Sequence, residues 1–146
     1  MFFIKKKSKL SVLMSIGVLL IITVILNSSN FANLLSVETT PVVEYVTSEV
    51  EDGVYCAGDT IPIKIVFSEN VNVIGTPQLL LETGPTNRYA DYESGSGSME
   101  LIFNYSLENG DISNDLDYVS TTSLELSGGS TIKNTSGTVD ADVTLP

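Results

Sequence analysis

The sequence has no histidine, no tryptophan and only one cysteine, Cys56. Without histidine the chain lacks the commonest general base, the Ser-His-Asp and Cys-His nucleophile systems, and the usual zinc ligand. A single cysteine forms no internal disulfide, so the folded part must be stabilised by its own core, which about 105 residues can supply. We expect Cys56 itself to be a half-buried free thiol.

Carboxylates are the catalytic groups that remain. Glycoside hydrolysis needs two acids across a cleft, and the chain has 18 Asp and Glu residues. The lack of tryptophan removes the best aromatic platform for a sugar, however, and acids spread over a β-rich surface are mostly solvated charge. We therefore predict that the protein is not an enzyme, with a secreted hydrolase as the second alternative.

Basic residues are scarce and gather at the N-terminus. Four lysines between residues 5 and 9 precede an uncharged run, Leu10 to Leu26, which is typical of an export signal or a membrane anchor. The length of this run fits both a long cleavable signal and a short spanning helix, so cleavage and single-pass anchoring through residues 10–26 stay open. In either case the lysines stay in the cytoplasm, and the remainder is exported to the cell surface or the extracellular space.

The exported part is strongly acidic. From Glu38 onward all 18 acidic residues remain, and the only basic ones are Lys64, Arg88 and Lys133, which gives a net charge of 3 − 18 = −15. Such a charge disfavours nucleic acid and anionic lipid as partners. It is compatible with divalent cations, and equally with an acidic surface that only keeps the domain soluble.

After residue 40 the sequence is typical of short β-strands. Apolar residues occupy alternate positions from Ile61 to Phe67 and from Leu101 to Tyr105, the period of a strand with one buried face. Gly-, Pro-, Asn- and Ser-rich turns separate the runs, and we interpret Ser94–Ser98 as a hairpin turn. We predict an antiparallel β-sandwich, with strands at 42–48, 60–68, 71–73, 78–83, 88–94, 99–106, 123–127 and 142–145.

The stretch "NGDISNDLDY" has an oxygen-bearing side chain at every second position: Asn109, Asp111, Ser113, Asp115 and Asp117. Calcium takes six to eight oxygen ligands, which alternate positions of a tight loop can supply. The candidate metal site is therefore Asp111, Asp115 and Asp117, with calcium as the only candidate cofactor.

The helix-loop-helix calcium template itself is rejected. Its position 6 needs glycine and its position 12 glutamate, but this stretch has Asn114 and Ser120 there. The simpler interpretation is a polar turn at Asn109-Gly110, in which Asp115 and Asp117 accept hydrogen bonds from nearby backbone N–H groups. A second acidic region, Glu49 to Asp59, has the same two interpretations.

The residues from about Val46 to Pro146 resemble the immunoglobulin-like repeats of large prokaryotic surface and adhesin-type proteins. The ordered motifs that carry this resemblance are Gly58-Asp59, Phe67-Ser68-Glu69, Gly75-Thr76-Pro77, Ser94-Gly95-Ser96-Gly97 and Asp115-Leu116-Asp117-Tyr118. The resemblance implies an all-β, immunoglobulin-like antiparallel β-sandwich that serves in spacing, display or adhesion and has no catalytic residues. We expect an N-terminal hydrophobic helix to precede this domain. The predicted parts are a signal peptide or membrane anchor (1–27), a linker (28–40) and the domain (41–146).

We therefore expect a non-catalytic structural or adhesive module at the cell surface. Its partners would be a surface protein, a glycan or neighbouring immunoglobulin-like modules. The first alternative is a calcium- or glycan-binding module. Members of the family also tend to continue past the equivalent of "VTLP" into a further strand. We expect the domain to lack that strand and to leave an open sheet edge that another chain completes by strand addition.

Overall fold

In the computed structural model, which describes residues 38–146, the alternating stretch that begins at Thr60 forms the longest strand, β2 (Thr60–Ile74). Its predicted inward residues, from Ile61 to Phe67, are all buried. The sequence predicted two strands here, at 60–68 and 71–73, but β2 is continuous. Its register against the neighbouring strand shifts between Val66 and Val71, so the strand bends without ending.

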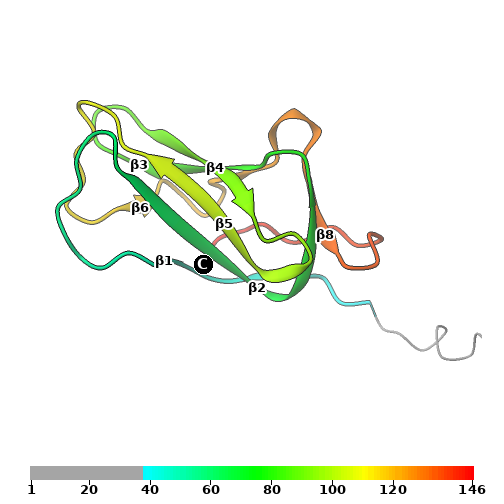
Figure 1. The fold of residues 1–146 in the computed structure, drawn as a ribbon. Coiled ribbons are helices and arrows are strands. Elements are labelled where there is room, and N and C mark those ends of the chain that lie inside the picture. The colour runs from blue at the N-terminus through cyan, green and yellow to red at the C-terminus, as the bar shows by residue number, and fades with distance from the viewer. Residues whose placement is uncertain (1–37) are drawn as a thin grey trace, which may run out of the picture. The chain divides into compact units, whose positions relative to one another are not determined.

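The strands form one antiparallel sheet that curls on itself (Figure 1). Its order is β1-β2-β5-β4-β3-β6, and two short strands lie off this path: β7 pairs with β3, and β8 pairs with the second half of β2. Besides β2, the strands are β1 (Val43–Ser48), β3 (Gln78–Glu82), β4 (Arg88–Ser94), β5 (Ser98–Ser106), β6 (Asp117–Tyr118), β7 (Leu124–Glu125) and β8 (Thr131–Asn134).

The core lies inside the curl. Phe67 and Phe103 are its largest fully buried side chains, and Tyr92 meets the Phe103 ring edge-on at a centroid distance of 5.7 Å. The same core includes Leu79 from β3 and Leu124 from β7, so strands distant in the sequence share one apolar interior. The core lies wholly within residues 39–146, which form a compact unit of their own.

The predicted hairpin turn between β4 and β5 is present. Gly95 there has a φ of +111°, and a Cβ at this position would overlap the Glu100 carbonyl oxygen. Only glycine fits such a backbone without strain. The Gly/Ser run is therefore a tight turn and not a flexible linker.

The structure confirms the all-β, antiparallel class and four of the predicted strands within one residue, at 42–48, 78–83, 88–94 and 99–106. It adds β6 and β8, which the sequence pattern does not predict. Residues 142–145 were predicted to be a strand, but this is wrong, because they form only a single bridge, between Val42 and Asp142. The predicted N-terminal helix lies outside the described residues. Within 38–146 no helix is long and apolar enough to cross a membrane.

The last residues, 140–146, which we call the C-terminal tail, run along the edge of the sheet. Asp142 N–H donates to the Pro41 carbonyl at 2.8 Å, and the bridge from Asp142 to Val42 is parallel. Three residues later Leu145, which is buried, donates its N–H to the Thr121 carbonyl at 2.8 Å. The tail thus has hydrogen bonds to both ends of the curled sheet, and it closes part of the gap between them.

Candidate functional site

Asp111, one of the three predicted calcium ligands, lies at the centre of a polar cluster. Its carboxylate is only 6% exposed. It accepts hydrogen bonds from the Tyr105 hydroxyl at 2.8 Å, from the Glu108 backbone N–H at 2.8 Å and from Arg88 Nε at 3.1 Å. A carboxylate with three donors is well satisfied without a metal. We call these four residues the Asp111 cluster.

The cluster shifts the ionisation of its members. Burial by itself would raise the pKa of Asp111, but the hydrogen bonds from Glu108, Tyr105 and Arg88 outweigh it, so that pKa is lowered. Burial, together with the hydrogen bond to Asp111, raises the pKa of Tyr105 to about 12. The hydrogen bond to Asp111 also raises the pKa of Arg88. At neutral pH the cluster therefore holds a carboxylate, a neutral phenol and a guanidinium.

The cluster ties a loop to the sheet. Arg88 begins β4 and Tyr105 lies near the end of β5, whereas Asp111 belongs to the loop that follows β5. The Asp111 N–H donates to the Glu108 carbonyl at 3.3 Å, and Arg88 also contacts the exposed carboxylate of Glu108 at 2.8 Å. Ile112 N–H continues the attachment with a bond to the Thr83 carbonyl at 2.9 Å. The polar turn predicted at residues 109–110 is thus fixed in place.

The other two predicted ligands do not join Asp111. Asp117 is exposed and accepts a hydrogen bond at 2.7 Å from the N–H of the next residue, Tyr118. Asp115 is exposed, and its backbone carbonyl accepts from the Ser113 hydroxyl at 2.8 Å. Within residues 38–146 no three His, Cys, Asp or Glu side chains form a group that could hold a metal ion. Calcium binding by this stretch stays a prediction.

The second acidic region, 49–59, is a loop held by local bonds. The Asp59 carboxylate accepts from Cys56 N–H at 2.7 Å, and the Tyr55 hydroxyl donates to the Glu51 carbonyl at 2.6 Å. The expectation of a half-buried Cys56 is wrong, since its thiol is free and exposed. The turn between Cys56 and Asp59 is closed by their backbone groups as well, and it holds the cysteine at the surface.

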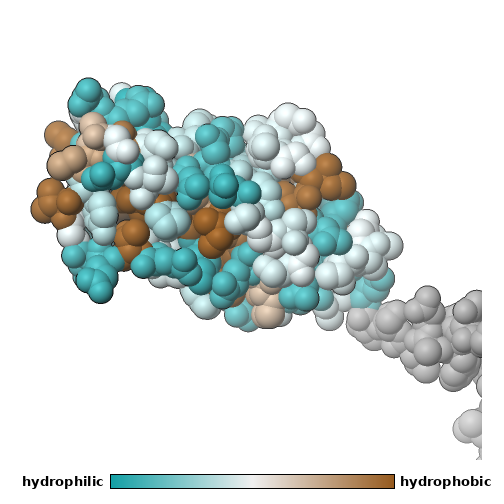
Figure 2. All heavy atoms as spheres, in the orientation of Figure 1, coloured by the Kyte–Doolittle hydropathy of each residue, from teal (hydrophilic) through white to brown (hydrophobic). Residues whose placement is uncertain are grey.

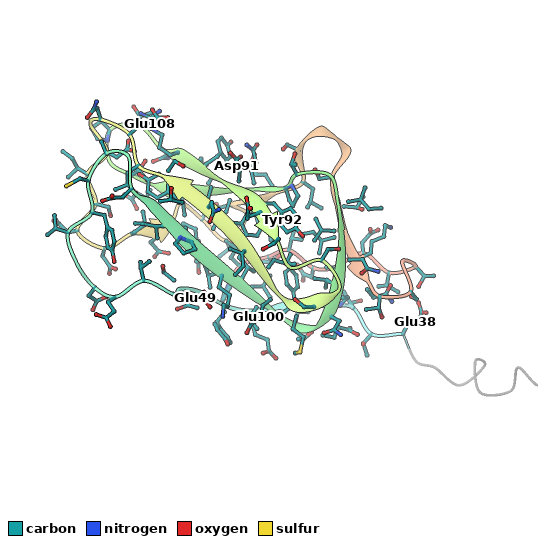
Figure 3. All side chains as sticks on the ribbon, viewed as in Figure 1. Glu38, Glu49, Asp91, Tyr92, Glu100 and Glu108 are labelled. Carbon is teal, nitrogen blue, oxygen red and sulfur yellow. The ribbon has the colours of Figure 1, made fainter. Side chains whose placement is uncertain are left out.

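All three basic residues of the described range form ion pairs with acids of the domain. Lys64 lies 2.5 Å from Glu49 and 3.1 Å from Glu100, and Figure 3 shows these two acids on the same side of the sheet. Lys133 lies 2.7 Å from Asp140, at the start of the tail. With Arg88 in the Asp111 cluster, every cation of the described range is paired, so most acids on the surface have no basic neighbour.

Between the two fixed loops lies an open cleft of about 870 Å³, which we call the end cleft. One wall is formed by residues 46–55, which comprise the last part of β1 and the loop after it. The opposite wall is formed by residues 111–118. Core residues form the floor, among them Ile63 and Tyr105. Figure 2 shows brown apolar surface at this end of the domain, and the exposed apolar residues of the two walls are Val54 at 95% and Ile112 at 68%.

Neither the end cleft nor the partners of Asp111 were predicted from the sequence. A weak signal was present for one of them: only three cations follow residue 37, so a buried carboxylate in the domain had few possible counter-ions. The chain matches no protein-family model, no curated protein and no solved structure.

Proposed function

We propose that this chain is a non-catalytic structural or adhesive module of the cell surface, an immunoglobulin-like β-sandwich exported behind residues 1–27. The observation that carries the proposal is the way in which the domain uses its polar groups. Its three cations and the buried carboxylate of Asp111 bind loops and tail to the sheet. A domain whose ends and loops are fastened in this way keeps its shape, which spacing and display require.

The sheet order supports the immunoglobulin-like assignment. Neighbouring strands are antiparallel from β1 to β6, whereas the C-terminal tail runs parallel to the start of β1. Immunoglobulin-like sandwiches enclose one core between two faces of antiparallel strands, and here the curl of a single sheet encloses such a core. The tail lies where a last strand would join the two ends of that sheet.

Export is tested with Cys56, because it is the only cysteine and is exposed. Intact cells that produce the full chain are treated with a membrane-impermeant maleimide, and Cys56→Ser serves as the control. We expect labelling of the wild-type chain without lysis. Labelling that appears only after lysis would place the domain inside the cell and would refute the proposal.

The structural or adhesive role is tested separately. Cells that produce the full chain are compared with cells that produce residues 1–38 alone, for attachment to one another and to protein- or glycan-coated surfaces. We expect attachment, or the reach of a label displayed on the surface, to depend on residues 39–146. Equal behaviour of the two strains would contradict the proposal.

A further inference from the structure

The end cleft separates two sheet edges that have no strand between them. Within residues 38–146, β1 pairs only with β2, apart from the bridge at Val42, and β6 pairs only with β3. Edges of this kind expose backbone N–H and C=O groups that are ready to pair with an added strand. Both edges border the same cleft, because residues 46–48 and 116–118 are among the residues that line it.

The C-terminal tail shows how wide the gap is. At Asp142 the tail bonds to Pro41, which lies just before β1, and at Leu145 it bonds to Thr121, which follows β6. A single extended segment therefore reaches both sides, as expected when one strand fits between two edges about 4.8 Å away on either side. The Tyr118 hydroxyl also donates to the Pro146 carbonyl, so the tail ends against a wall of the cleft.

The direction of the tail leads into the cleft. Because Asp142 lies opposite Val42 in a parallel bridge, residue 146 is about level with Val46, the first residue of β1 that lines the cleft. A strand that continued along this line would be parallel to β1. It would be antiparallel to β6, since the order of antiparallel pairs from β1 to β6 makes those two strands opposite in direction.

The lining determines which side chains such a strand would have. Core residues such as Ile61, Ile63 and Leu81 form the floor, which favours apolar residues on the inward side of the strand. The acids of the lining are Glu51, Asp52, Asp111, Asp115 and Asp117, and none of the described lining residues is Lys or Arg. The exposed acids favour basic residues on the outward side.

We propose that the end cleft binds an extended segment of another polypeptide, with alternating apolar and basic residues, as an added strand parallel to β1 and antiparallel to β6. This inference deepens the adhesive part of the proposed function, because it names the chemistry of a protein partner. It rests on the geometry of the two edges and does not depend on where the domain is displayed. Labelling of Cys56 and binding in the cleft therefore fail or succeed separately.

The test uses the full chain in neutral detergent and a fluorescent peptide of about nine residues that alternates valine with lysine. Binding is followed by fluorescence anisotropy at about 0.15 M ionic strength, where exposed charges alone are screened beyond about 8 Å. One control peptide carries N-methyl groups on alternate backbone nitrogens, and another has glutamate in place of lysine. We expect both controls to bind about tenfold more weakly or worse, because the first cannot form the hydrogen-bond ladder to the edge that its methyl groups face and the second meets like charge.

Variants of the chain locate the site. Thr47→Trp fills the cleft from β1 and should weaken binding by about tenfold, and Asp115→Asn with Asp117→Asn should weaken it severalfold. Glu93 is an exposed residue of β4 that does not line the cleft, so Glu93→Gln is the matched control and should leave the affinity unchanged. Hydrogen exchange on the bound chain should show new protection of amides in residues 46–48 and 116–118.

Three results would overturn the proposal. The first is no binding of the basic peptide by the wild-type chain. The second is equal binding of the N-methylated peptide, which would reduce the interaction to charge attraction. The third is binding that Thr47→Trp leaves unchanged or that protects no amide on either edge, which would place the peptide elsewhere.

Discussion

Replacing Tyr105 by Phe removes one hydroxyl from the Asp111 cluster and leaves the aromatic ring in the core. The lost bond joins a buried phenol to a carboxylate at 2.8 Å, and hydrogen bonds to charged groups contribute about 1.5–3 kcal/mol. Asp111 keeps its hydrogen bonds from Arg88 and from the Glu108 N–H, so its buried carboxylate still has two donors. We therefore expect a loss of about 2 kcal/mol, which lowers the melting temperature of residues 38–146 by about 8–15 °C.

The pH dependence gives an independent measure of the same group. The pKa of Tyr105 is raised from 10.0 to about 12 in the folded state. Between pH 10 and pH 12 the unfolded state therefore binds fewer protons than the folded state, so stability is complete below pH 10 and falls as the pH rises. A shift of this size corresponds to at most about 2.7 kcal/mol. Phenylalanine does not titrate, so in Tyr105→Phe this part of the loss of stability at alkaline pH should disappear.

Other groups titrate in the same range, and the comparison of variants removes them. The hydrogen bonds that Lys64 donates to Glu49 and Glu100 raise the pKa of Lys64, and burial together with the hydrogen bond to Glu125 raises the pKa of Tyr89. Each of these groups therefore also lowers stability as the pH rises through its range. Denaturant melts of the wild type, Tyr105→Phe and the exposed control Tyr45→Phe at pH 8, 10 and 11.5 isolate Tyr105. A Tyr105→Phe variant with the wild-type slope above pH 10, or with an unchanged midpoint at pH 8, would refute the role given to the cluster.

The remaining predictions concern the same domain. The lowered pKa of Asp111 contributes stability that is present above pH 3.8 and lost as the pH falls through the folded pKa. Asp111→Asn should therefore make stability depend less on pH in the acid range. The same dependence in the variant and the wild type would contradict this. Gly95→Ala should lower the free energy of unfolding by about 2–4 kcal/mol, because the new Cβ overlaps the Glu100 carbonyl. Gly128→Ala, which has open space and a φ of +65°, should lower it by about 1 kcal/mol. Equal melting temperatures of the two variants would disprove the difference. If residues 109–118 bind calcium as the sequence predicts, calcium should raise the melting temperature of residues 38–146, magnesium should not reproduce the rise, and Asp115→Asn with Asp117→Asn should abolish it. An unchanged melting temperature would contradict the calcium site and leave the stretch as a polar turn.

The parts of the fold that the sequence predicted are those set by local pattern. Alternation from Ile61 to Phe67 decides which side of β2 is buried whatever its partners are, since a slip by one residue would expose the whole apolar set. The Gly/Ser turn at 94–98 is likewise local, because the positive φ of Gly95 requires glycine there. These features follow from a few neighbouring residues.

The missed features depend on residues far apart in the sequence. β6 has only two residues, and its pairing with Leu81 and Glu82 defines it as a strand. Arg88 and Asp111 are brought together by the β4–β5 hairpin and the loop after it, which no spacing rule anticipates. The alternating oxygens from Asn109 to Asp117 suggested one metal site, but hydrogen bonds to Tyr105 and Arg88 draw Asp111 inward and leave Asp115 at the surface.

The Asp111 cluster also belongs to the end cleft, since Tyr105 and Asp111 both line it. By fixing residues 108–112 to the sheet, the cluster holds the start of the wall formed by residues 111–118 before any partner arrives. A wall that is already ordered loses less entropy on binding.

Tyr105→Phe should therefore weaken binding of the basic peptide even at temperatures where the variant is fully folded. Gly95→Ala, which also destabilises the domain but does not line the cleft, should leave the affinity unchanged. If both variants weaken the peptide equally, general loosening of the domain explains the effect, and the cluster does not preorganise the cleft.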